Sequence, residues 1–204
     1  MTVAAVVFDI GNVLIRWDPV VHYDRVIGEA ARRALFAAVD LHGMNLSVDR
    51  GEDLHAAVEA LAARHPDHAR DIRRWRDEWL DFVLGPIDGS VALLHRLRAA
   101  GVPVVALTNF GHAPLAMAEA AWPFLRDFDA RFVSADLRLL KPDPAIYAAV
   151  EDGTGLPPAS LFFIDDKAEN VAAAAARGWQ AHLFRAPGTL VADLMARGVP
   201  GAAP

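Results

Sequence analysis

The chain contains no cysteine, which excludes a disulfide framework, a thiolate zinc site and a cysteine nucleophile. It also has no apolar run of the ~18 residues that a membrane-spanning helix needs. Positive charge is scarce, because 26 acidic residues outnumber 20 lysines and arginines and give a net charge of −6. Surfaces that bind nucleic-acid phosphates depend on clustered lysine and arginine. We therefore expect no nucleic-acid partner and no membrane partner.

The N-terminal segment has no basic leader, and its first apolar run ends at Asp9 after a few residues. Such a run is too short for the hydrophobic part of a secretion signal. The chain has 204 residues, of which 54% are hydrophobic and 23% are charged. This suits one globular domain of about 100–200 residues, or a domain with a modest insertion. We expect a cytoplasmic protein that is a monomer or a homodimer.

Short apolar runs alternate with helical patterns at both ends of the chain. Four runs have the continuous apolar character of strands buried on both faces: residues 3–8, 102–107, 161–164 and 179–184. Residues 88–100 and 166–177 instead carry apolar side chains at helical spacing, and Gly101 and Gly178 follow them. This alternation predicts a doubly wound α/β fold, with a parallel sheet and right-handed crossovers.

The strand pattern disappears in the middle of the first half of the chain. Three segments there have a helical pattern: residues 29–39, 52–64 and 68–84. We therefore predict an α/β core of residues 1–17 and 86–204. A helical cap of residues 18–85 would be inserted after the first strand and lie over the strand ends.

Polar residues follow three of the predicted strands, at the edge where parallel α/β sheets bind their ligands, and a short segment before a helix supplies Lys141. The candidates are carboxylates, a hydroxyl, amides and a lysine: Asp9, Gly11, Asn12, Thr108, Asn109, Lys141, Asp165 and Asp166. Asp9 ends a buried strand, where an unpaired carboxylate is costly to desolvate. We therefore expect Asp9 to be paired with a cation or bound to a metal.

Some of these residues also fit a purely structural role. Asp166, Thr108 and Asp143 each stand where a side chain can cap the N-terminus of the following helix. Lysine usage favours a function for Lys141, because only Lys141 and Lys167 are lysines among the 20 basic residues, and both lie in these segments. A compact ammonium suits a place where a point charge must fit against phosphate and carboxylate.

Four motifs occur in order along the chain: FDIGNVL at residues 8–14, LTNF at 107–110, KPDPAIY at 141–147 and FIDDKAEN at 163–170. With these motifs the sequence resembles the haloacid dehalogenase (HAD) superfamily of hydrolases, in the branch with a helical cap after the first strand. Within that branch it is similar to sugar-phosphate phosphatases with an FD-x-GNV first motif. The resemblance extends over essentially the whole chain.

The resemblance implies a reaction centred on Asp9. This carboxylate would attack phosphorus in line and form an aspartyl-phosphate that water then hydrolyses. Mg²⁺ would be bound by Asp9, by the main-chain carbonyl of Gly11 and by Asp165 or Asp166, because this hard cation prefers oxygen ligands.

The same resemblance implies a phosphate cradle. Thr108, Asn109 and Asn12 would bind the substrate. Lys141 would neutralise the nucleophile and the phosphoryl group, an electrostatic effect that dominates phosphoryl transfer. The substrate would be a small phosphorylated metabolite.

One position departs from the pattern of the family's phosphatases. They usually carry a second aspartate two residues after the nucleophile as general acid and base, and here that residue is Gly11. General acid–base catalysis contributes about 10²–10⁴-fold. We interpret Asp18, with His22 behind it, as the residue that supplies the proton instead.

Glycine at residue 11 is also compatible with two different functions. The chain would be a metal-independent 2-haloacid dehalogenase that uses the same Asp9 nucleophile, since those relatives also lack the second aspartate. The pair Asp165 and Asp166 has little purpose in a metal-free site that binds an anionic carboxylate, so we favour the phosphatase. Alternatively, the chain would be a catalytically weak HAD-fold protein that binds a metabolite, a hypothesis that Gly11 alone supports.

Overall fold

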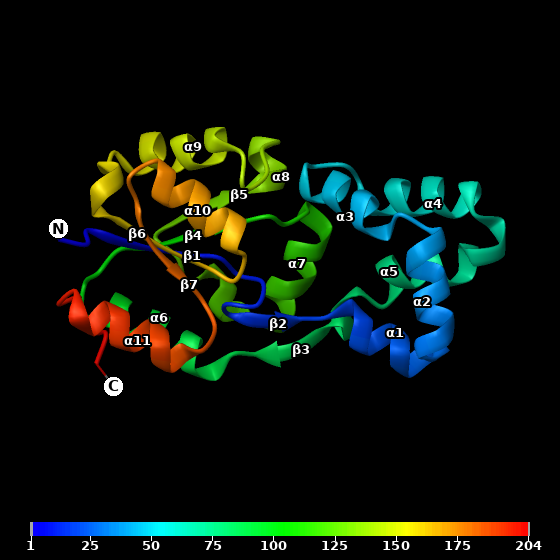
Figure 1. The fold of residues 1–204 in the computed structure, drawn as a ribbon, viewed down its shortest axis with the longest axis horizontal. Helices are drawn as coiled ribbons and strands as arrows, with labels where there is room; N and C mark the ends of the chain where they lie inside the picture. The colour runs from blue at the N-terminus through cyan, green and yellow to red at the C-terminus, as the bar shows by residue number, and fades with distance from the viewer. Residues whose placement is uncertain (1, 204) are drawn as a thin grey trace.

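The computed structural model describes residues 2–203. Its core is a five-stranded parallel sheet in the order β5-β4-β1-β6-β7 (Figure 1). The strands are β1 (Ala5–Phe8), β4 (Val104–Thr108), β5 (Ala130–Val133), β6 (Leu161–Asp165) and β7 (Gln180–Leu183). Strand β1 pairs with both β4 and β6, so the first strand of the chain is central. The predicted parallel α/β fold is confirmed.

Helices cover both faces of this sheet (Figure 1). Neighbouring side chains of β1 point to opposite faces, and Val6 and Val7 accordingly belong to two separate apolar clusters. One cluster includes residues of α9 and α10, and the other includes residues of α6, α7 and α11. The core helices are α6 (Asp88–Ala99), α7 (His112–Ala121), α8 (Ser134–Leu137), α9 (Pro144–Thr154), α10 (Ala168–Ala176) and α11 (Pro187–Ala196).

A two-stranded antiparallel ribbon joins the core to the segment that was predicted as a cap. The chain leaves through β2 (Ile15–Trp17) and returns through β3 (Val83–Pro86). The prediction of one helix over residues 68–84 is wrong in its second half, because α5 ends at Asp77 and a short 3₁₀ helix and β3 follow. These strands are too short to carry an alternating pattern, and pairing between distant segments forms them.

Five α-helices lie between the two strands of this ribbon and gather on one side of the sheet (Figure 1). They are α1 (Pro19–Ile27), α2 (Glu29–Ala38), α3 (Leu41–Asp49), α4 (Leu54–Arg64) and α5 (Ala69–Asp77). The 3₁₀ helices of the chain are η1 (Pro66–His68), η2 (Trp79–Phe82), η3 (Pro123–Arg126) and η4 (Pro158–Ser160). Within residues 2–203, no helix has both the length and the apolar character needed to cross a membrane.

Two of the five helices were not predicted. Helix α1 begins with Pro19 at a position that favours helix starts and is capped by Asp18. Helix α3 contains Gly43 and Asn45, both weak helix formers, and is capped by Asp40, whose carboxylate accepts the N–H of Gly43 at 2.7 Å. In both helices the capping residue is a local signal, and in α3 the buried Leu41, Met44 and Val48 also recur at helical spacing.

Candidate active site

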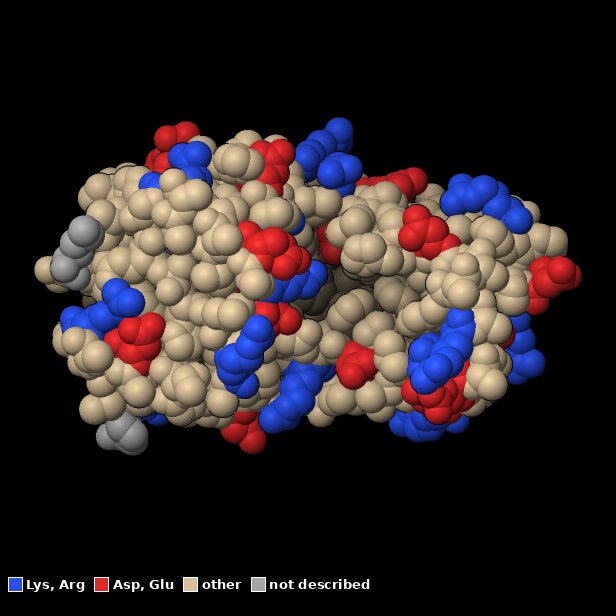
Figure 2. Space-filling view, viewed as in Figure 1, with Lys and Arg blue, Asp and Glu red and all other residues tan. Residues whose placement is uncertain are grey.

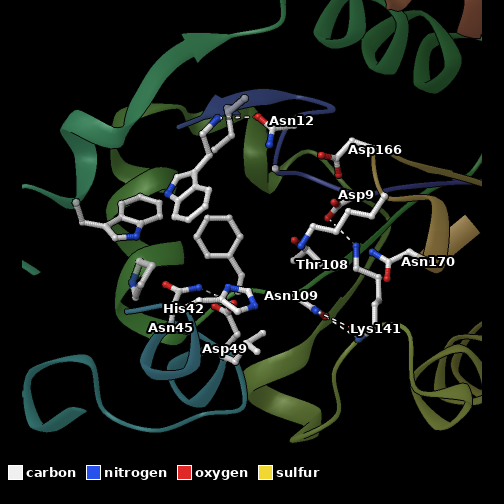
Figure 3. A pocket seen from close by; sticks show the side chains of 18 residues that line it. Asp9, Asn12, His42, Asn45, Asp49, Thr108, Asn109, Lys141, Asp166 and Asn170 are labelled. Carbon is white, nitrogen blue, oxygen red and sulfur yellow. Dashed lines mark hydrogen bonds and ion pairs between the residues drawn. The ribbon is translucent and has the colours of Figure 1, made fainter. Parts of the chain in front are cut away.

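A pocket of about 170 Å³ lies between the carboxyl edge of the sheet and helix α3. In the space-filling view the surface is hollowed near the middle of the molecule, with charged side chains around the opening (Figure 2). Figure 3 shows residues of the sheet edge on one side of this pocket, among them Asp9, Thr108 and Lys141. His42 and Asp49 face them from α3.

Asp9 follows β1 directly and is 8% exposed. The Nζ of Lys141 lies 2.8 Å from its Oδ1 atom. Burial raises the pKa of Asp9 to about 6, and the neighbouring acids add to this rise while Lys141 opposes it. At neutral pH the carboxylate is therefore ionised and paired with the lysine, as expected from its place at the end of a buried strand.

Lys141 is enclosed by acceptors. Its Nζ donates to Asp9 Oδ1 at 2.8 Å, to Asp165 Oδ2 at 2.7 Å and to the carbonyl of Leu107 at 3.0 Å. An ammonium has three N–H donors, so this geometry uses all of them. Burial lowers the pKa of Lys141, but the two carboxylates outweigh burial and leave it raised. The lysine therefore remains charged inside the protein.

Asn109 fixes the main chain of Lys141. The Oδ1 of Asn109 accepts the N–H of Lys141 at 2.8 Å, and its Nδ2 donates to the Lys141 carbonyl at 3.0 Å. The side chain that we predicted to bind substrate thus holds the lysine in place. Asn109 also lines the pocket, next to Thr108 at the end of β4.

The neighbouring acids Asp165 and Asp166 have different surroundings. Asp165 is fully buried and accepts hydrogen bonds from Asn170 Nδ2, from the N–H of Lys167 and from Lys141. Asp166 is half-buried and lines the pocket. Desolvation and the charge of Asp165 raise the pKa of Asp166. Asp165 thus positions Lys141, whereas Asp166 presents its carboxylate to the pocket.

Three acids converge closely enough to hold a cation. One carboxylate oxygen each from Asp9, Asp165 and Asp166 lie within 4.8 Å of one another. All of these donors are oxygens, the ligand type of Mg²⁺ and Ca²⁺. The raised pKa values of Asp9 and Asp166 reflect like charges crowded in a desolvated place, and a divalent cation relieves such crowding.

Gly11 and Asn12 form the turn after Asp9 and also line the pocket. Asn12 has a φ of 54°, and its Oδ1 accepts the N–H of Trp17 at 3.0 Å, so it fixes the turn as well as facing the cavity. A Cβ placed on Gly11 would meet no atom within 4 Å, and Gly11 is not among the residues with positive φ. The backbone therefore does not require glycine at residue 11.

The capping roles considered for three residues have different outcomes. Asp143 caps α9, accepting the N–H of Ala145 at 2.9 Å. Thr108 does not cap α7, whose N-cap is Gly111, and Asp166 does not cap α10, which begins without a side-chain cap. Thr108 and Asp166 are therefore free to face the pocket.

The structure gives Asp18 a role other than the predicted one. It does not line the pocket, and its carboxylate accepts the N–H groups of Val20 and Val21 at 2.9 and 3.2 Å. His22 is buried among the cap helices, with Glu78 2.6 Å from its Nε2. Asp18 thus caps α1, because a proline after an aspartate starts the helix at this point, and the His22 ring contacts Glu78. The role of Asp18 as proton donor, with His22 behind it, stays a prediction.

Sequence reasoning missed the pocket residues of α3, which are His42, Asn45 and Asp49. Asp49 is 9% exposed, and its Oδ2 accepts a hydrogen bond of 2.9 Å from Asn45 Nδ2. Burial raises the pKa of Asp49 to about 7. The spacing of three and four residues places these side chains on one face of a helix, but this signal has meaning only once α3 is known.

The fold and the site together define a doubly wound α/β protein with a buried aspartate–lysine pair at the carboxyl edge of its parallel sheet. The chain belongs to the haloacid dehalogenase-like hydrolases, because a family model of that description matches residues 3–178.

Curated relatives include two (S)-2-haloacid dehalogenases, from Pseudomonas fluorescens and Pseudomonas putida. They are 28% and 26% identical over 96 residues, which is 47% of this chain. The matched segment spans 42% of the length of each relative, so less than half of those proteins is compared.

Solved structures share the fold. A HAD family enzyme from Bacteroides thetaiotaomicron, in complex with magnesium and inorganic phosphate, superimposes with a TM-score of 0.71 at 20% identity, covering 90% of this chain and 95% of that one. An L-2-haloacid dehalogenase from Xanthobacter autotrophicus with covalently bound chloropropionic acid has a TM-score of 0.63 at 21% identity, covering 100% and 85%. At these identities the likeness establishes the fold alone.

Proposed function

We propose that this hydrolase is a Mg²⁺-dependent phosphatase that acts on a small phosphorylated metabolite. The charge balance of the pocket carries the proposal. Asp9, Asp165 and Asp166 bring three carboxylates close together, and among the described residues the one ion-pair partner of this group is Lys141, which contacts Asp9 and Asp165. An anionic substrate meets net repulsion in such a site unless a divalent cation binds with it.

The residues fit a magnesium ion by their chemistry. Asp9 and Asp166 supply carboxylates at the pocket, and Gly11 also lines it, so that its carbonyl would be a third oxygen ligand. Asp165 accepts hydrogen bonds from Lys141 and Asn170 and holds Lys141 in place beside Asp9. When bound, the ion would neutralise charge on the phosphoryl group and help to orient it.

Each remaining group of the site has a task in phosphoryl transfer. The ionised carboxylate of Asp9 attacks phosphorus, so that an Asp9 oxygen–phosphorus bond forms as the ester bond breaks and the alcohol leaves. Lys141 keeps Asp9 ionised and oriented. The Thr108 hydroxyl and the N–H of Asn109 donate hydrogen bonds to phosphoryl oxygens, and water then hydrolyses the aspartyl-phosphate.

A 2-haloacid dehalogenase is the second candidate, favoured by the partial similarity to the two Pseudomonas enzymes. Asp9 would then attack carbon and expel halide, and the substrate carboxylate would need a cationic partner. Only two lysines line the described pocket. Lys141 is already bound to two carboxylates, and Lys167 is exposed at the rim. The pocket suits a haloacid less well than a phosphate ester with its metal.

Two assays on the purified protein separate these functions. A phosphatase releases p-nitrophenol from p-nitrophenyl phosphate and phosphate from a panel of phosphorylated metabolites, with Mg²⁺ present and not with EDTA. A dehalogenase releases chloride from 2-chloropropionate in EDTA. Chloride release without Mg²⁺-dependent phosphate release would overturn the proposal, and Asp9→Asn is the control that must abolish whichever activity is found. Phosphate binding with no turnover on any ester would leave the fold as a binding protein and would also refute the proposal.

A further inference from the structure

The proposed phosphatase lacks an assigned proton donor for its leaving group. Residue 11 is glycine, and the Asp18 carboxylate caps α1. An alkoxide is a poor leaving group, and protonating it is worth about 10²–10⁴-fold in rate. The inference that follows rests on the proposed function and concerns the acid on the cap side of the same pocket.

Asp49 lies at the pocket wall opposite Asp9 (Figure 3). Although α3 falls within the segment between β2 and β3, the main chain at Asp49 is bound to the core. The Ser134 hydroxyl donates to the Asp49 carbonyl at 2.5 Å and accepts the N–H of Phe110 at 2.8 Å. Asp49 is thereby tied to the loop that follows Thr108.

The glycines around this contact show how closely the two segments approach. A Cβ on Gly111 would lie 2.5 Å from a methyl group of Val48, and one on Gly51 would lie 2.8 Å from the carbonyl of Ala135. Only glycine permits such an approach. The end of α3 is therefore seated on the core and keeps its position relative to the nucleophile.

The side chain of Asp49 is oriented as firmly as its main chain. The Trp75 Nε1, which can only donate, bonds to Asn45 Oδ1 at 3.1 Å. Asn45 must then present its Nδ2 to Asp49 Oδ2, where the distance is 2.9 Å. The main-chain N–H of Gly111 acts on the same carboxyl and lowers its pKa, against the larger effect of burial.

No cation contacts this carboxyl among the described residues. The charges that act on it from a distance are Lys167, Asp9 and Lys141. His42 lies on its own helix, and His112 of α7 and Asp136 of α8 pair with each other at 2.8 Å on the surface. Burial thus dominates and raises the pKa of Asp49 to about 7, so that a neutral solution contains both the acid and its conjugate base.

We propose that Asp49 is the general acid and base of the phosphatase reaction, acting directly or through one water molecule. In the first step the Asp49 carboxyl gives its proton to the leaving oxygen as the ester bond breaks and the Asp9–phosphorus bond forms. In the second step the Asp49 carboxylate takes a proton from the attacking water as the water oxygen–phosphorus bond forms and the Asp9–phosphorus bond breaks. Asp49 is then protonated again, and one alcohol and one phosphate have been released.

Leaving-group dependence tests this role in the Mg²⁺-loaded protein. The probes are p-nitrophenyl phosphate, whose phenolate leaves without help, and phenyl phosphate, whose phenolate is more basic. We expect Asp49→Asn to lower kcat/KM for phenyl phosphate about 100-fold and for p-nitrophenyl phosphate less than about 5-fold. We also expect the variant to lose the limb of the pH–rate profile near pH 7. Equal losses for both esters, or no loss, would overturn the assignment.

A second substitution provides rescue. Residue 11 has room for a side chain and no positive φ, so Gly11→Asp can place a carboxyl where related phosphatases have one. The double variant Asp49→Asn with Gly11→Asp should recover at least about 10-fold of the lost kcat/KM for phenyl phosphate. Failure of this rescue, with the fold intact by circular dichroism, would argue that Asp49 has a structural role only and would overturn the proposal.

Asp136→Asn is the matched control, because it removes an exposed acid from α8 without touching the pocket. Both esters should be hydrolysed at the wild-type rate. A wild-type protein without any Mg²⁺-dependent phosphatase activity would refute the proposed function itself. An active wild type whose Asp49→Asn variant behaves like the Asp136→Asn control would refute only the role of Asp49.

Discussion

The two walls of the pocket are built from the chain in different ways. On the sheet side, Asp9, Thr108 and Asp166 each stand within a residue or two of a strand end, and parallel strands bring those ends to one edge. On the cap side, Asp49 depends on a helix within the insertion and on a contact with Ser134, 85 residues further along. The first wall follows from local order along the chain and the second from packing between distant segments.

The largest effect should come from the sheet wall. Asp9→Asn removes the nucleophile while keeping the shape of the side chain, and we expect kcat to fall by at least about 10⁴-fold. Phosphate release from p-nitrophenyl phosphate measures the change. The protein should stay folded, because Asp165 still pairs with Lys141 at 2.7 Å. Retention of more than about one per cent of the activity would show that another residue attacks phosphorus.

The next effect concerns the lysine that joins the acids. Lys141→Met leaves the fully buried Asp165 without its ammonium partner, and such an unpaired charge typically costs about 3–5 kcal/mol of unfolding free energy. Lys141→Arg should not restore activity, since a planar guanidinium does not match three acceptors around one nitrogen. Urea unfolding measures the stability, and Lys167→Met, at an exposed lysine, should leave it nearly unchanged.

On the cap wall the expected effect is a change in how stability depends on pH. The folded protein raises the pKa of Asp49 from 3.8 to about 7, so between these values the folded state binds a proton that the unfolded chain has released. The contribution of Asp49 to stability is fully present below pH 3.8 and is lost as pH rises through 7.

The comparison of Asp49→Asn with wild type isolates that contribution. The variant should gain stability relative to wild type as pH rises from 4 to 7, by at most about 1.4 kcal/mol per pH unit. Urea unfolding at several pH values, with Asp136→Asn as control, measures the difference. A constant difference across this range would mean that Asp49 is ionised in the folded protein, contrary to its burial.

The smallest effect should come from Asp18, at the entrance to the cap. Asp18→Ala removes a helix cap and should cost about 1 kcal/mol of stability. Turnover should change less than about tenfold, because the side chain does not line the pocket. Thermal unfolding and the p-nitrophenyl phosphate assay check both. A larger loss of turnover would restore Asp18 as a candidate proton donor.

Of the four strands that sequence reasoning found, three are buried along their whole length, whereas β7, at the sheet edge, is only partly buried. β1, β4 and β6 are continuous apolar runs without exposed positions. β5 was missed because the exposed Arg131 interrupts its short apolar run. β2 and β3 were missed because three or four residues cannot display a period, and because Gly85, with a φ of 111°, resembles a loop residue.

The site was predictable to the extent that its residues follow strands. Asp9, Thr108 and Asp166 were found in this way, Lys141 was found through the scarcity of lysine, and all four line the pocket. The sequence could not show whether Asp165 or Asp166 faces the cavity. The answer depends on which of these two carboxylates accepts the hydrogen bonds of Asn170 and Lys141, and in the structure it is Asp165. The role of Asp49 could not be predicted from the sequence, because its burial depends on the packing of α3 against segments distant in the chain, such as Ser134.

The hydrogen bond between Ser134 and the Asp49 carbonyl has a consequence for access to the pocket. The insertion is connected to the sheet domain by strands β2 and β3, and the hydrogen bond from Ser134 to the Asp49 carbonyl attaches it at a third point. Rotation of the insertion about the two connecting strands alone would break this hydrogen bond. Access to the pocket is therefore coupled to the Ser134–Asp49 contact, a hydrogen bond whose loss would cost about 0.5–1.5 kcal/mol.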